Sequence, residues 1–364
     1  MRFFATKSGI ILSGLIVGIF SVMLVVLGNP GNMGVCVACF YRDVAGALGL
    51  HQAELVQYMR PEILGILLGA FIIAFATGEF KPQGGSSTIL RFFIGMMVMF
   101  GALVFLGCPL RMLFRLGGGD LNALIALFGF AGGILTGIYF LKNGFTLGRA
   151  YNQPVGSGLV LPFIFFVLVV LTGVGGFFIT SVKGPGSQHA PFLIALVIGL
   201  LVGIVAQRTR LCIAGSIRDA FLIRDFHLLA GVIAVLIATI IMNIVYGKFN
   251  LSFTGQPVAH TEHLWNFLGL YVVGLGSIFL GGCPLRQTIL AGQGNIDSAV
   301  TIVGFIIGAA LAHNFGIAAS PKGVPMAGKY MVVISMVIMF VIGILQSDFV
   351  SAFVAGDKKA SVKG

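Results

Sequence analysis

Charged residues are scarce in this sequence. Of its 364 residues, 22 are Lys or Arg and 11 are Asp or Glu, and together they make up 9% of the chain. A soluble domain carries about 25% charged residues, so this chain cannot cover its own surface in water. The hydrophobic share of 58% and the mean hydropathy of +1.05 indicate an integral membrane protein with the lipid bilayer as its partner.

Extended basic runs are also missing, although the formal net charge is +11. Apart from Lys358 and Lys359 in the C-terminal tail, basic residues lie mostly in the short connections between apolar runs. The positive-inside rule of membrane proteins predicts this distribution. We therefore expect no nucleic-acid partner.

Long apolar runs are plentiful, and we count ten of them. The first follows basic residues, as in a signal peptide, but about 20 apolar residues suffice to cross a bilayer. No small-residue cleavage site is clear after it, so we expect a first transmembrane segment. The ten expected spans cover residues 9–28, 62–80, 92–107, 122–141, 158–180, 190–206, 228–247, 264–281, 298–316 and 330–347.

Cysteine is rare, and all five cysteines lie in motifs that occur twice. "VCVACFYRDV" at residues 35–44 matches "LCIAGSIRDA" at residues 211–220, with Gly215 where Cys39 would repeat. "GCPLR" occurs at residues 107–111 and again at residues 282–286. The two copies of each motif are 175 or 176 positions apart, so an internal duplication is expected.

The duplication predicts two repeats of five spans each. The first covers residues 1–181, with re-entrant segments at 29–44 and 108–119. The second covers residues 182–364, with re-entrant segments at 207–220 and 283–296. Because five is odd, the second repeat must enter the membrane from the opposite side, and such inverted repeats are typical of transporters.

The distribution of basic residues favours both termini in the cytoplasm. With the N-terminus inside, most Lys and Arg residues fall in inside connections and tails. Those in the two tails are Arg2, Lys7, Lys358, Lys359 and Lys363.

The cysteine motifs then face opposite sides of the membrane. Cys36 and Cys108 follow spans that run outward, whereas Cys212 and Cys283 follow spans that run inward. Irregular backbone is tolerated at membrane depth only where it packs in protein or lines a wet cavity. We expect four re-entrant segments that meet near the middle, with the thiols lining a narrow waist between two funnels.

The residue types at this waist suit a soft anion. A neutral thiol is a weak donor and a polarizable contact, which fits an anion whose outer atom is sulfur or selenium. We therefore place Cys36, Cys39, Cys108, Cys212 and Cys283 along a substrate pathway.

Two arginines and two aspartates lie beside the motifs. Arg111 and Arg286 either attract an anion at each mouth or hold helix-end carbonyls and reach the interface, and the sequence favours neither reading. Asp120 and Asp297 lie where the following helices start, so N-capping is expected for both.

Other functions for the motifs have to be weighed. Cys36 and Cys39 form a C-x-x-C pair, which fits a redox pair or half of a metal site, so the main alternative is a membrane thiol oxidoreductase. A nonspecific anion channel is a third reading. The "HTEH" at residues 260–263 is expected to be a plain loop, and His313 to bond a helix carbonyl. We predict no metal, no cofactor and no enzymatic activity.

The paired "GCPLR" stretches, with a cysteine motif after the first span, resemble the YeeE/YedE sulfur-transport family of bacterial inner-membrane proteins. The resemblance covers nearly the whole chain and is strongest for the YedE branch, which is linked to selenium. It implies an all-α membrane protein of about ten transmembrane segments in two inverted repeats, with short re-entrant helices forming an hourglass. It also implies uptake of a small sulfur- or selenium-containing anion.

The resemblance extends to single residues and to a partner. Cys36, Cys108 and Cys283 match the family's central cysteines, and Cys212 is the repeat partner of Cys36. Thiosulfate-type members tend to carry glycine after the motif cysteine, whereas Pro109 and Pro284 stand here, so a selenium species remains open beside thiosulfate. Family partners include small cytosolic sulfur-carrier proteins of the TusA type.

Overall fold

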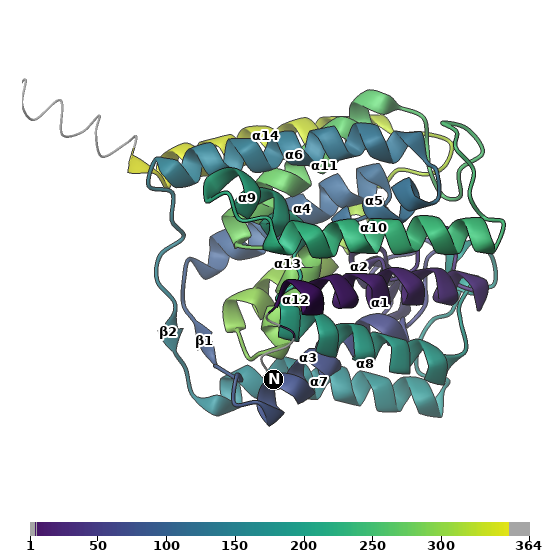
Figure 1. Cartoon of the computed structure of the whole chain (residues 1–364), viewed down its shortest axis with the longest axis horizontal. Helices are drawn as coiled ribbons and strands as arrows, with labels where there is room; N and C mark the ends of the chain where they lie inside the picture. The colour runs from purple at the N-terminus through teal and green to yellow at the C-terminus, as the bar shows by residue number, and fades with distance from the viewer. Residues whose placement is uncertain (1–3, 5, 349–364) are drawn as a thin grey trace, which may run out of the picture.

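Long apolar helices make up most of the molecule (Figure 1). The computed structural model describes residue 4 and residues 6–348. Within that part of the chain, nine helices are long and apolar enough to cross a membrane. They are α1 Lys7–Val26, α4 Thr88–Phe105, α6 Leu121–Lys142, α7 Val155–Val174, α8 Phe192–Thr209, α10 His227–Val245, α11 His263–Leu280, α13 Ile296–Asn314 and α14 Met326–Leu345.

A tenth apolar helix, α3 (Pro61–Ala76), has 16 residues. Each of the ten expected spans therefore coincides with an apolar helix, and the prediction of an all-α, multi-pass membrane protein is confirmed. Three small elements lie in the connections. The strands β1 (Gln83–Gly84) and β2 (Tyr151–Asn152) pair antiparallel, and Pro185–Ser187 forms one 3-10 turn.

Four short helices of nine to eleven residues alternate with the long ones. They are α2 (Val37–Ala47), α5 (Pro109–Gly117), α9 (Ile213–Leu222) and α12 (Pro284–Gly292). The described chain thus runs through the same order of long and short helices twice, first as α1–α7 and then as α8–α14. The counterparts α4 and α11 begin 175 positions apart, as do α5 and α12.

Helices of one half pack mainly on helices of the other. In Figure 1, α1 lies beside α10, and the principal contacts pair α1 with α10, α3 with α8, α6 with α11 and α4 with α13. Replacing each helix by its counterpart turns the α1–α10 pair into the α8–α3 pair. It likewise turns the α6–α11 pair into the α13–α4 pair.

The counterparts α4 and α11 lie against each other and run in opposite directions. Gly101, late in α4, approaches Gly269, early in α11, whereas Val98, earlier in α4, approaches Gly276, later in α11. By contrast, α1 and α10 run parallel. Gly14 contacts Gly231, and Gly18, one turn later in α1, contacts Ala238, about two turns later in α10.

Two matched glycines allow close helix approaches. A Cβ atom on Gly129 of α6 would overlap the carbonyl oxygen of Phe267 on α11, and a Cβ on Gly304 of α13 would overlap that of Phe92 on α4. Small residues that let backbones approach closely are the usual basis of helix packing in lipid.

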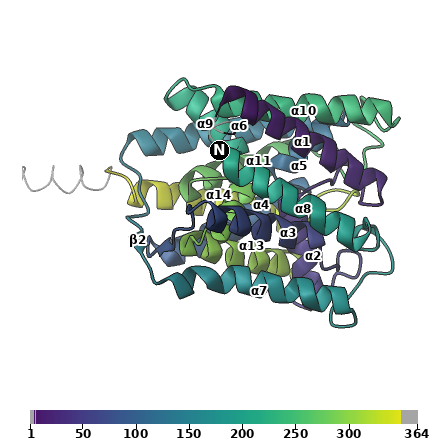
Figure 2. The same ribbon diagram turned by 60° about the horizontal axis from the view of Figure 1, so that its bottom comes forward.

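The start of α1 and the end of α14 lie toward the same end of the bundle, on the left of Figures 1 and 2. The end of α14 also lies near the end of α6, because the backbone N–H of Asp348 donates to Asn143 O. Arg2, Lys358, Lys359 and Lys363, which entered the prediction of orientation, lie outside the described residues.

Candidate functional site

The four motif cysteines each occupy the N-cap position of a short helix. Cys36 precedes α2, Cys108 precedes α5, Cys212 precedes α9 and Cys283 precedes α12, all with extended backbone. The sequence explains these helix starts, because Pro109 and Pro284 supply the φ angle that the first helical position requires and lack an N–H there.

The five cysteine sulfurs form two groups, one in each half of the chain. In the first-half group, Cys36 Sγ lies 2.7 Å from Cys39 Sγ and 3.9 Å from Cys108 Sγ. In the second-half group, Cys212 Sγ lies 3.8 Å from Cys283 Sγ. All five are free thiols and buried, with Cys212 the most exposed at 5%.

Two short helices therefore begin at each cysteine group. The N-terminus of a helix carries unpaired N–H groups and the positive end of the helix dipole. At the first-half group the N–H of Cys39 donates to Cys36 Sγ over 3.3 Å, and at the second-half group the N–H of Gly215 donates to Cys212 Sγ over 3.2 Å. Both groups thus present soft sulfur atoms in surroundings that favour negative charge.

Arg111, in the first turn of α5, is fully buried and bonded to backbone. Its guanidinium donates to the carbonyl oxygens of Leu106, Asn32 and Val258, the last two over 3.2 Å each. Its Nη1 also lies 3.6 Å from Cys39 Sγ. This arrangement corresponds to the expected lock on helix-end carbonyls, since Leu106 is the C-cap of α4.

Arg286, the counterpart of Arg111, is held differently. It is half-buried, and its Nη1 is buried without a hydrogen-bond partner in the described chain. The carbonyl that matches Leu106 O is that of Gly281, and no hydrogen bond joins it to Arg286 within the described chain. Gln287 Nε2 donates to Leu280 O over 2.9 Å, and the matching carbonyl in the first half, Phe105 O, accepts from Arg115.

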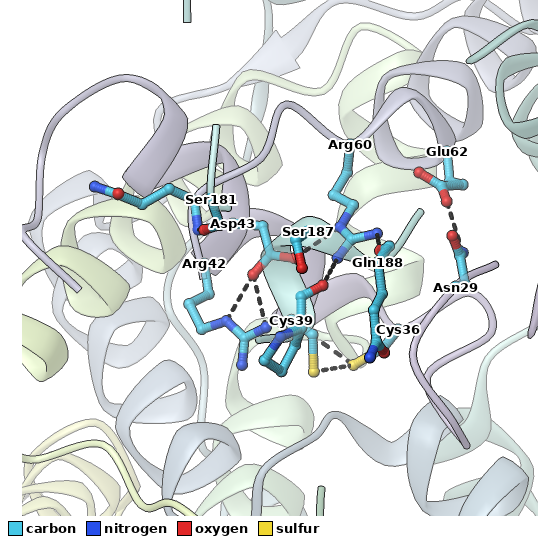
Figure 3. A network of polar contacts seen from close by, with 12 residues as sticks. Asn29, Cys36, Cys39, Arg42, Asp43, Arg60, Glu62, Ser181, Ser187 and Gln188 are labelled. Carbon is cyan, nitrogen blue, oxygen red and sulfur yellow. Dashed lines mark hydrogen bonds and ion pairs between the residues drawn. The ribbon is translucent and has the colours of Figure 1, made fainter. Parts of the chain in front are cut away.

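A buried ion network holds α2 beside the thiols (Figure 3). Asp43 accepts hydrogen bonds from Arg42, over 2.8 and 2.6 Å, and from Arg60 Nε over 2.7 Å. Arg60 also donates to Gln188 O and Pro185 O, over 3.0 and 2.8 Å, which ties α2 to the connection before α8. All three charged side chains are nearly or fully buried.

The second half contains only part of this network. Arg218 pairs with Asp219 over 2.8 Å, with side chains 32% and 16% exposed. Sequence comparison of the halves detected the Arg42–Asp43 and Arg218–Asp219 pairs but missed Arg60. Arg60 is the N-cap of α3, and Phe226 is the N-cap of the counterpart α10, so no repeat signal marks this arginine.

Asn29 supports the segment that leads to Cys36, and sequence reasoning missed it too. Its Nδ2 donates to Glu62 Oε1 over 2.7 Å, and its Oδ1 accepts from the N–H of Ala190 over 2.9 Å. The same Nδ2 lies 3.3 Å from Gly34 O, two residues before Cys36. Figure 3 shows the Asn29–Glu62 contact beside the cysteines.

The two aspartates near the motifs have different roles. Asp120 caps α6 as expected, because its side chain accepts from the N–H of Asn122, and it also binds Arg115 over 2.6 Å. The N-cap expected of Asp297 is wrong. Asn295 caps α13, whereas Asp297 accepts hydrogen bonds from Ser86 and Gly85 in the β1–α4 connection.

The two histidines that the sequence analysis considered, His260 and His313, have different surroundings. His260 lies in the connection before α11, where burial lowers the pKa of its ring and Nε2 donates to Val104 O over 2.8 Å. His313 differs from expectation. Its ring lies 4.7 Å from the ring of His51, and its Nε2 has no hydrogen-bond partner among the described residues.

Comparison with known proteins connects this site to a family. The Sulphur transport family model matches residues 208–355, which include Cys212, Arg286 and Cys283. The chain is 28% identical over 123 residues to the thiosulfate transporter TsuA of Escherichia coli, covering 34% of each chain. It is 31% identical over 100 residues to the thiosulfate transporter TsuA of Spirochaeta thermophila, covering 27% of this chain and 29% of that one.

The matched segments therefore span about a third of the length of these curated relatives. They agree with the family resemblance that the paired "GCPLR" motifs carry, and the names of the relatives are those of transporters rather than enzymes. The second half of the chain, residues 208–355, is thus similar to the Sulphur transport family.

Proposed function

We propose that this protein takes up a small sulfur-containing anion across the bacterial inner membrane, through a pathway lined by the two cysteine groups. The observation that carries the proposal is the start of two short helices at each group of thiols. Helix N-termini pointing at an anionic substrate are a recurrent device of transporters. Soft thiols add selectivity for an anion that ends in sulfur.

The two halves, residues 1–181 and 182–364, would act as inverted repeats. The antiparallel run of the counterparts α4 and α11 supports this arrangement, as does the exchange of packing partners between the halves. In that arrangement the short helices are re-entrant, both termini are cytoplasmic, and the cysteine groups face opposite sides of the membrane.

Arg111 and Arg286 would have different roles. Arg111 is saturated by backbone carbonyls, so its role is to fix α5 and to place a positive charge near Cys39. Arg286 has a buried Nη1 free of hydrogen bonds within the described residues. We assign Arg286 the direct contact with the anion, because a guanidinium without a partner gains most from one.

Thiosulfate is the first candidate substrate because both curated relatives are named thiosulfate transporters. A selenium anion is the second candidate, because selenium shares the polarizability of sulfur. Delivery to a TusA-like cytosolic carrier protein follows from the family resemblance alone.

Uptake into proteoliposomes tests the proposal. The purified protein is reconstituted, and the accumulation of labelled thiosulfate, selenite and sulfite is compared with that in empty vesicles. We expect saturable uptake of thiosulfate or of selenite. Equal uptake of all small anions, chloride included, would show a nonspecific channel instead.

One observation favours a second function. Cys36 and Cys39 lie in contact in a C-x-x-C motif, as a membrane thiol oxidoreductase would require. An oxidoreductase would pass electrons from a dithiol donor to an acceptor in the absence of any vesicle, whereas a transporter needs closed vesicles for its signal.

A further inference from the structure

The first-half cysteine group contains one thiol more than the second. Cys39 lies three residues after Cys36, in the first turn of α2, and Gly215 takes its place in α9. The N-cap position of Cys36 turns its side chain back over the start of the helix, where its sulfur accepts from the N–H of Cys39. The two sulfurs are thereby brought to 2.7 Å.

This placement leaves little movement for a covalent bond. A disulfide needs its sulfurs at about 2.05 Å, so closure requires a shift of under ~1 Å between two side chains on one helical turn. Cys108 Sγ is farther from Cys36 Sγ, at 3.9 Å, and lies on a different helix. The Cys212–Cys283 pair in the second half is likewise 3.8 Å apart and spans two helices.

The surroundings also favour the reactive thiolate. Arg111 Nη1 lies 3.6 Å from Cys39 Sγ, and both sulfurs sit at the positive end of α2. Cationic neighbours and helix N-termini are the features that make cysteines in C-x-x-C motifs reactive.

We propose that Cys36 and Cys39 are a modification site, a dithiol that a small peroxide oxidises reversibly to a disulfide. The Cys39 thiolate attacks one peroxide oxygen and becomes a sulfenic acid, and the hydroxide that leaves takes the proton given up by Cys39 to form the first water. The Cys36 thiol then attacks that sulfur, and its proton leaves with the hydroxyl group as the second water. Two thiols and one hydrogen peroxide thus give one disulfide and two waters, and a dithiol reductant restores the thiols by exchange through a mixed disulfide.

The consequence for transport rests on the proposed function. In the disulfide neither Cys36 nor Cys39 has an S–H to donate, so the first-half group keeps only the thiol of Cys108 for a soft anion. Because the second half has Gly215, only the first-half group can be closed in this way. The modification would therefore shut the pathway from one side.

Mass spectrometry of the full-length protein tests the site without any transport measurement. The protein is treated with hydrogen peroxide, denatured, alkylated at its free thiols and digested. We expect one disulfide within the peptide that contains Cys36 and Cys39, reversed by dithiothreitol, and three alkylated cysteines. Disulfides to Cys108, or five alkylated cysteines after treatment, would overturn the proposal.

Two variants serve as controls. Cys39→Gly copies the second-half motif and Cys39→Ser preserves the size of the side chain, and both should lose the reversible disulfide while eluting as folded protein. Gly215→Cys makes the converse change and should create a second peroxide-sensitive pair with Cys212. Failure of Gly215→Cys to do so in a folded protein would contradict the geometric argument.

Uptake is measured separately, and each variant is compared with its own reduced form. Peroxide should abolish most uptake by the wild-type protein and leave the ratio of oxidised to reduced uptake near unity in Cys39→Ser. If the disulfide forms and uptake is unchanged, the modification site stands and the proposed cysteine pathway is contradicted.

Discussion

Arg60 and Asp43 form an ion pair that is completely buried, with Arg60 Nε 2.7 Å from Asp43 Oδ2. The carboxylate of Asp43 is shared with Arg42, so one negative charge holds two guanidinium groups at the middle of α2, about one turn after Cys39. The pair with Arg60 thus ties the helix that begins at the first-half cysteine group to the start of α3.

Removing the charge of Asp43 should destabilise the protein strongly. In Asp43→Asn, Arg42 and Arg60 remain buried without a counter-charge, and loss of one partner of a buried pair costs about 3–5 kcal/mol. Thermal unfolding in detergent should show a large fall in melting temperature. Asp219→Asn is the matched control, since Asp219 pairs with Arg218 near the surface, where a pair contributes about 0–1 kcal/mol. Equal falls in both variants would refute the role assigned to Asp43.

The two matched arginines should respond differently to truncation. In Arg111→Ala one buried and two partly buried carbonyls lose their donor, and an unsatisfied buried group costs about 1–3 kcal/mol, so the protein should unfold at a lower temperature. Arg286→Ala removes no hydrogen bond to a carbonyl of the described residues and should keep near-normal stability. Its effect should be a raised KM for thiosulfate uptake, and a stability loss as large as that of Arg111→Ala would count against the assignment.

Replacement of the single motif thiols should abolish uptake with little effect on folding. Cys108→Ala and Cys283→Ala each remove one buried sulfur, and loss of such a small group costs roughly 1 kcal/mol of packing. Because each thiol lines the proposed pathway, uptake of thiosulfate should fall to a small fraction of wild type in both variants. Normal uptake with normal protein levels would make these cysteines ordinary core residues.

The sidedness of the two cysteine groups follows from the proposed inverted arrangement. In single-cysteine variants, a membrane-impermeant thiol reagent added outside should modify Cys108 faster than Cys283, and inverted vesicles should show the reverse. Reporter fusions after Arg149 should report cytoplasm and fusions after Lys183 periplasm. Equal labelling of both groups from one side would exclude the hourglass.

Local patterns predicted much of this fold because they act along the chain. Each apolar run became a helix, and four of the five motif cysteines mark a helix start. Long-range partners were less visible. Arg60 has no arginine at the matching position of the second half, so the repeat does not mark it.

The error at Asp297 has a similar origin. The residue that matches Asp120 at the 175-residue spacing is Asn295, which also caps a helix. The prediction instead chose Asp297, two positions later, because it is also an aspartate. The asymmetry between Arg111 and Arg286 was equally hidden, since both stand in identical "GCPLR" sequences. Identical local sequence fixes the helix start but not the partners of its side chains.

The exchange of packing partners between the halves has a consequence for the origin of the chain. Since α1 packs on α10 and α3 on α8, a chain that stopped after α7 would leave the buried faces of its helices bare. Two copies of such a half-length ancestor, inserted in opposite orientations, would cover those faces for each other. Fusion of the two gene copies of such a homodimer would make the assembly permanent, and differences such as Cys39 against Gly215 could then arise.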